Sequence, residues 1–218
     1  MTNADLTCWT LIREAADGDP DARERFGRVY LAVVRAYLAA RWRGLRHDIE
    51  DAAQDVFVEC FRAGGVLEKA DPDRGGFRAF LLGAVRNVAR RHEAGQRQPD
   101  QLPTDIPDDD AGPAEAFDRA WAQALLRDAA RVQEEAAQQS GPAAVRRVQL
   151  LRLRFGDGLP IREIARVWRE DAAKLHHDYA TAREEFQAAL RIVVAYHQPG
   201  IAVGELDRAC EELLGLLG

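Results

Sequence analysis

Residues 48–92, DIEDAAQDVFVECFRAGGVLEKADPDRGGFRAFLLGAVRNVARRH, contain two oppositely charged segments that decide the fold. In the first segment, apolar side chains recur every three or four residues, which predicts an amphipathic helix with Asp48 as its N-cap. The same spacing occurs over residues 76–92. Arginines lie near the C-terminal end of this expected helix, where the helix dipole favours cations. The stretch therefore predicts an acidic helix and a basic helix, joined by a polar loop over residues 69–76.

The charge of these two helices does not by itself indicate a function. A charged face opposite an apolar stripe is usually an ordinary solvated surface. The order of residue types along the stretch is a more specific signal than its charge, because it can be compared with known sequence patterns position by position.

The order of residues in this stretch resembles region 2 of the extracytoplasmic-function (ECF) sigma factors of bacterial RNA polymerase. The first segment is similar to the family's acidic helix, D-x-E-D-x-x-Q-[DE]-x-F, and the second to F-R-x-W-L-x-x-[IV]-x-R-N. Phe80 stands where the family commonly has tryptophan, so no indole is expected to take part. The positions that match are Asp51, Gln54, Asp55, Phe57, Phe77, Arg78, Leu81, Arg86 and Asn87.

The resemblance implies a promoter-specificity subunit that binds core RNA polymerase and promoter DNA and is not an enzyme. The acidic helix would contact the clamp helices of the largest polymerase subunit through Asp48, Asp51, Gln54 and Asp55. The loop and the basic helix would capture the unpaired strand of the minus-ten element, since arginines can follow phosphates and aromatic rings can stack on bases. The residues expected to do so are Lys69, Arg74, Phe77, Arg78, Phe80, Arg86, Asn87, Arg90 and Arg91.

Phe77 and Phe80 also have a structural interpretation. They lie three residues apart on the expected apolar face, a spacing that favours core positions for both over direct contact with a base.

The composition is that of a soluble, mainly helical protein. Of the 218 residues, 47% are hydrophobic and 30% charged, as in globular domains. Residues that favour strands are sparse, so an all-α fold is expected. The net charge of −6 argues against a general nucleic-acid coat, because sequence-independent binding depends on Lys and Arg neutralising phosphates. It leaves room for local basic patches.

The cysteines and the first residues predict a cytoplasmic protein without a cofactor or metal. Cys8, Cys60 and Cys210 lie far apart and form no metal-binding motif, which suits a reducing compartment. Cys60 falls on an apolar face and is expected in the core. The chain begins without a basic segment followed by an apolar run, and no run is long enough to span a membrane, so no membrane partner is expected.

The prolines and glycines that interrupt the apolar repeats predict two small helical domains joined by an acidic, proline-rich linker. The expected parts are a region 2-like domain over residues 1–94, a linker over 95–113, a region 4-like domain over 114–195 and an amphipathic extension over 196–218. The linker contains prolines and aspartates with too few apolar groups to order itself. It is either a flexible tether or, as the resemblance implies, a segment that threads the polymerase cleft.

The region before the acidic helix is expected to contain two more helices, over residues 6–16 and 20–40. Asp19 is placed to cap the second of these, with Pro20 at its first position. A basic connector, RWRGLR over residues 41–46, follows. It either contacts nucleic acid or forms a solvated turn in which Trp42 is tucked against the protein.

Residues 156–190, GDGLPIREIARVWREDAAKLHHDYATAREEFQAAL, have the spacing of a helix-turn-helix. They resemble sigma region 4, whose second helix reads the minus-thirty-five element. Arg169 stands where the family usually has a turn glycine, and Asp178 is unfavourable among phosphates and acceptor edges. Packing or partner binding is therefore an alternative role. The DNA-contacting candidates are Lys174, His176, His177, Tyr179 and Arg183.

Three functions are compatible with these patterns. The first is an ECF sigma factor, and the second is a sigma-like adaptor that binds polymerase or a regulator without reading a promoter. The third is an enzyme, for which the sequence offers no phosphate loop or catalytic triad order. The extension over residues 196–218 either packs on its own domain or binds a regulatory partner such as an anti-sigma protein.

Overall fold

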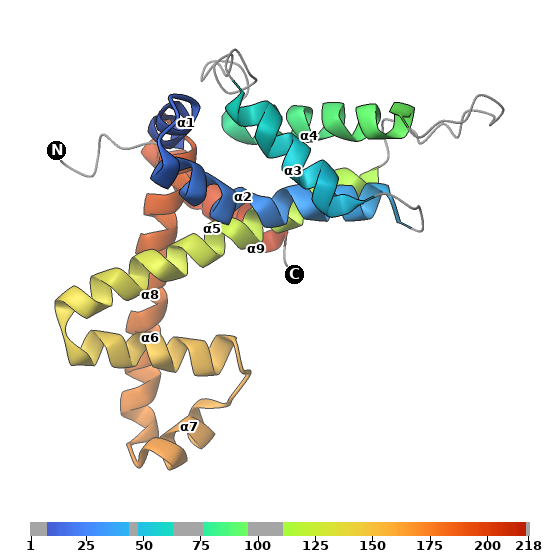
Figure 1. Ribbon diagram of the computed structural model, residues 1–218. Helices are drawn as coiled ribbons and strands as arrows, with labels where there is room; N and C mark the ends of the chain where they lie inside the picture. The colour runs from blue at the N-terminus through green and yellow to red at the C-terminus, as the bar shows by residue number, and fades with distance from the viewer. Residues whose placement is uncertain (1–7, 44–47, 63–75, 96–110, 217–218) are drawn as a thin grey trace. The chain divides into compact units, whose positions relative to one another are not determined.

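The computed structural model of the chain describes residues 8–43, 48–62, 76–95 and 111–216. Within these ranges the fold consists of nine α-helices and contains no strand (Figure 1), so the expected all-α class is confirmed. The helices are α1 (Cys8–Ala16), α2 (Pro20–Arg41), α3 (Ile49–Phe61), α4 (Gly76–Gly95), α5 (Ala111–Ser140), α6 (Pro142–Phe155), α7 (Ile161–Trp168), α8 (Ala172–His197) and α9 (Val203–Gly215). None of the described helices is both long and apolar enough to cross a membrane.

Two helices begin where the sequence predicted capping residues. The Asp19 carboxylate accepts a hydrogen bond from the Ala22 amide at 2.8 Å, and Pro20 occupies the first turn of α2. The Asp48 carboxylate accepts bonds from the amides of Glu50 and Asp51, at 2.9 and 3.1 Å. Each cap satisfies amides that lack a partner within the helix. These local signals fix where α2 and α3 start.

Both ends of the expected linker are helical. α4 continues to Gly95, and α5 already begins at Ala111. Pro113 is compatible with this start, because a proline in the first turn removes an amide that would have no helical acceptor. Residues 96–110 lie outside the described residues, as does most of the loop over residues 69–76.

The chain divides into two compact units whose limits differ from those of the expected domains. The first unit contains residues 1–124 together with 195–218, and the second contains residues 125–194. The first unit therefore includes the start of α5, the end of α8 and all of α9, in addition to the helices of the expected region 2-like domain.

The core of the first unit is an aromatic cluster to which α2, α4, α5 and α8 all contribute. The Tyr30 ring of α2 stacks on Trp121 of α5, with 5.5 Å between centroids and 15° between planes. Phe77 of α4 packs against Tyr30 at 5.0 Å, and Trp121 lies 5.6 Å from the imidazole of His197. The Cys8 thiol of α1 donates to the His197 carbonyl at 3.6 Å. Residues 8 and 197 thus belong to one core.

The second unit has its own small core, built from α6, α7 and the start of α8. Leu150, Ile164 and Leu175 are buried together between α6, α7 and α8. Arg169, at the turn, adopts φ 55° and ψ 43°, the left-handed conformation in which glycine is usual. This explains why the family pattern has glycine at the position. Here the Arg169 amide still caps α7 by donating to the Ala165 carbonyl.

Two buried thiols provide a test of the first unit's core. Cys8 and Cys60 are 0% and 1% exposed, and burial disfavours the thiolate, which raises the pKa of each thiol to about 12. Because the thiolate is the reactive form, neither should react with a thiol reagent at pH 8 in the folded protein. Both should react when urea unfolds the chain, as followed by absorbance at increasing denaturant. Rapid labelling of either residue without denaturant would contradict this packing.

Candidate functional site

The four residues expected to bind polymerase lie on the solvent side of α3. Asp48, Asp51, Gln54 and Asp55 are all exposed, while Ala52, Ala53, Val56 and Cys60 on the opposite side of the helix are buried. α3 packs against α2 and α4 through that buried side. The apolar spacing of the sequence therefore determines which carboxylates point away from the core.

Val58 continues the exposed face of α3 and was missed by the sequence analysis. Its side chain is 57% exposed. Val58 follows Gln54 and Asp55 by one helical turn, so it lies beside them on the helix surface. A signal was present, because Val58 does not fall on the apolar stripe of its helix. An exposed aliphatic residue next to carboxylates gives this face an apolar contact as well as charge.

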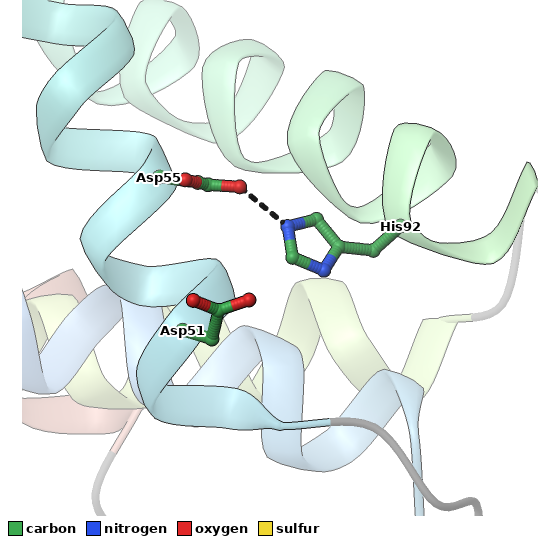
Figure 2. Close-up of side chains that lie close together, drawn as sticks. All are labelled: Asp51, Asp55 and His92. Atoms are coloured by element: carbon green, nitrogen blue, oxygen red, sulfur yellow. Dashed lines mark hydrogen bonds and ion pairs between the residues drawn. The ribbon is translucent and has the colours of Figure 1, made fainter. Parts of the chain in front are cut away.

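The end of α4 brings the side chains of Arg91 and His92 against the acidic face. His92 Nε2 lies 2.8 Å from Asp55 Oδ2 (Figure 2), and Arg91 Nη1 lies 3.2 Å from Glu59 Oε2. From the sequence, Arg91 was expected among the DNA contacts and His92 in no site. Nothing local connects residues that are 37 positions apart, so only the packing of α3 on α4 reveals the pair.

A buried ion pair fixes the end of α4 against the end of α2. Glu93 accepts hydrogen bonds from Arg41 Nε at 2.6 Å, Arg41 Nη2 at 2.9 Å and Trp42 Nε1 at 2.8 Å. The Arg41 side chain is 4% exposed and Glu93 13%. Trp42 is 3% exposed, so it is tucked against the protein. This network holds the last turns of α4, which carry Arg91 and His92, in place beside α3.

The residues expected at the minus-ten strand separate into core and surface positions. Phe77 is 1% exposed and packs inside the aromatic cluster, as the structural interpretation of its position expected. In this structure its ring cannot contact a base. Phe80 is half-buried, and Arg78 is exposed and forms an ion pair with Asp118 of α5. Lys69 and Arg74 lie outside the described residues.

The remaining candidates on α4 form one polar face. Arg90 follows Arg86 by four residues and Asn87 by three, so it lies beside both on the helix, and Asn87 and Arg90 are exposed. Arg86 is half-buried, and its Nε is buried without a hydrogen-bond partner in the part of the chain that the structure describes. Arg91 lies to the side of this face, toward α3. The polar face of α4 is thus separate from the acidic face of α3.

Four of the five candidates on α8 are exposed, and some of the five contact other residues of their own unit. Lys174 Nζ lies 2.9 Å from a carboxylate oxygen of Glu170, which also forms an ion pair with Arg146. Both cations lower the pKa of the Glu170 carboxyl, and the hydrogen bond from Lys174 contributes most. His176 and His177 are exposed. Two more candidates lie on the next turn, where the Arg183 guanidinium is 6.0 Å from the Tyr179 ring, and Tyr179 is half-buried.

Comparison with known proteins identifies one part of the chain. The Sigma-70 region 2 family matches residues 25–98, a range that contains α3, α4 and most of α2. No curated protein matches the chain. A Sigma-70 region 2 domain is therefore present, and it carries the acidic face of α3 and the polar face of α4.

This domain suggests a role in transcription initiation and implies binding to core RNA polymerase. Proteins of the sigma-70 family are not enzymes. The ECF subtype and the region 4 resemblance of residues 156–190 go beyond the matched range.

Proposed function

We propose that the chain is an ECF-type sigma factor that directs core RNA polymerase to a promoter. The observation that carries the proposal is the exposed acidic face of α3 within a Sigma-70 region 2 domain. In this proposal, Asp48, Asp51, Gln54 and Asp55 contact the clamp helices of the largest polymerase subunit. Complementary charges across such an interface speed association and select the partner.

The second element of the proposal is strand capture by α4. Arg86, Asn87 and Arg90 share a polar face, and arginine and amide side chains can contact the phosphates and base edges of an unpaired strand. Phe80 and Arg78, near the start of α4, lie next to the loop that the resemblance assigns to base capture. Phe77 is left out of the contact set and supports the helix from the core.

A specific observation favours the adaptor as a second candidate. On the proposed reading helix α8, Lys174 is paired with Glu170, and the half-buried Asp178 would meet a DNA surface of mostly negative character. A sigma factor should bind a duplex carrying the minus-thirty-five element with an affinity that falls steeply as salt rises. Binding to polymerase together with absent or salt-independent duplex binding would favour the adaptor.

Replacing Asp51 and Asp55 together by asparagine tests the docking surface. We expect the affinity for core polymerase to fall by about thirtyfold or more, because truncating charges at a desolvated interface costs about 2 kcal/mol or more. Titrating labelled protein with core polymerase and following fluorescence anisotropy measures this. Initiation at a defined promoter by the wild-type protein and core polymerase is the accompanying activity assay.

The matched control changes two other exposed acidic residues of the same unit, Asp21 to asparagine and Glu24 to glutamine, on the first turns of α2. This variant has the same net charge as the double asparagine variant. It should bind polymerase like the wild type, because the proposal depends on where the carboxylates lie on the surface and not on the net charge of the protein. Equal affinity of all three proteins for the polymerase would rule out the proposed docking face.

A further inference from the structure

The packing of α4 on α3 gathers three side chains that can each ligate a metal ion. Asp51 and Asp55 lie one turn apart on α3, and His92 approaches them from α4 (Figure 2). One ligand atom from each residue lies within 4.8 Å of the other two. Asp51 and Asp55 are exposed, so a cation can reach the group from solvent.

The three ligand atoms need only small movements to surround an ion. Nitrogen and oxygen ligands lie about 2.0–2.2 Å from Zn²⁺, so neighbouring ligands in a tetrahedral site are about 3.3–3.6 Å apart. Rotation of the two exposed aspartate side chains can supply this change. His92 Nε2 and Asp55 Oδ2, 2.8 Å apart, already form a hydrogen bond, and an ion lying between the two atoms would take the place of the shared proton.

The imidazole is held in place by its surroundings. Its side chain is 17% exposed, and the Trp42 ring lies 6.0 Å away. The next residue, Glu93, is fixed by Arg41 and Trp42. The nearby cation Arg91 is paired with Glu59, which offsets its repulsion of a metal ion. A fixed nitrogen ligand loses little freedom on binding.

We propose that Asp51, Asp55 and His92 form a site for a divalent transition-metal cation, with Zn²⁺ as the best-suited ion and water completing its coordination. Imidazole nitrogen suits Zn²⁺ and its neighbours, whereas Mg²⁺ and Ca²⁺ prefer oxygen ligands alone. No metal was expected from the sequence, where the cysteines form no metal-binding motif, and the 37 residues between Asp55 and His92 leave no local signal of this group. The proposal does not depend on polymerase binding.

Calorimetric titration of the full chain with ZnCl₂ tests the site. We expect one ion per chain, and we expect His92→Ala and Asp51→Asn each to weaken binding by at least about tenfold, the loss that changes around a metal site commonly cause. The matched control is a variant with alanine at both His176 and His177, which are exposed on α8. It should bind Zn²⁺ like the wild type.

Fluorescence gives a second readout at the same place. A paramagnetic ion such as Co²⁺, bound beside His92, should quench Trp42, and the quenching should be lost in His92→Ala and reduced in Trp42→Phe. Circular dichroism confirms that each variant is folded. The site is refuted if the wild type takes up no Zn²⁺, or if the His92→Ala and Asp51→Asn variants bind it as tightly as the wild type does. Loss of binding only in the α8 variant would also overturn the assignment.

Discussion

Replacing Glu93 by glutamine is expected to lower the free energy of unfolding by about 3–5 kcal/mol, because it leaves a buried charge without its partner. The Arg41 side chain is 4% exposed and donates two hydrogen bonds to the Glu93 carboxylate. That carboxylate also raises the pKa of Arg41, so the guanidinium stays charged. Glutamine keeps the shape of the side chain and removes the negative charge.

Urea denaturation followed by circular dichroism measures the loss. The matched control is Glu59→Gln, which breaks the more exposed pair with Arg91 and should cost less than about 1 kcal/mol. Adding Arg41→Met to Glu93→Gln should recover part of the stability, since an apolar side chain removes the unpaired charge. An unchanged denaturation midpoint for Glu93→Gln would contradict the importance of this pair.

Trp121→Ala is expected to destabilise the first unit by about 3–5 kcal/mol, the usual cost of deleting a large buried aromatic side chain. Trp121 is 5% exposed and stacks on both Tyr30 and Phe117. It lies outside the range that matches Sigma-70 region 2, yet it contributes to the core of the unit that contains this domain. Its loss should therefore weaken the domain that carries the acidic face.

Thiol labelling is the suitable measurement, because Cys8 and Cys60 report on the first unit alone even if the two units unfold separately. Labelling of Trp121→Ala should begin at a lower urea concentration than labelling of the wild type. The control is Phe155→Ala in the second unit, where the ring is 77% exposed, so the effect should stay within about 0.5 kcal/mol. Labelling of both variants at the same urea concentration as the wild type would show that Trp121 does not support this core.

The parts of the fold that the sequence predicted well depend on residues close together in the chain. The caps at Asp19 and Asp48 act on amides within three residues, and the apolar repeat of α3 covers only four turns. These signals were sufficient to place the acidic residues at the surface. The same repeat correctly favoured a core position for Phe77, which the family resemblance had assigned to DNA.

The parts that the sequence did not predict depend on distant partners. Glu93 meets Arg41 across 52 residues, and His92 meets Asp55 across 37. No periodicity indicates which charged residues will face each other once helices pack. α4 extends past its expected end where Glu93 is held by Arg41 and Trp42. The functional roles of the surface residues remain predictions, because exposure shows where a residue lies and not what it binds.

The contact between Cys8 and His197 joins positions 189 residues apart, and it has a consequence for biosynthesis. Helices α1 and α2 leave the ribosome early, but the interior that they share with the end of α8 cannot close until residue 197 has emerged. Contacts of such long range slow folding, since distant parts of the chain must meet first. The nascent protein would therefore expose the aromatic rings of Phe26, Tyr30 and Phe77 until residue 197 has been made, and chaperone protection matters most during that time.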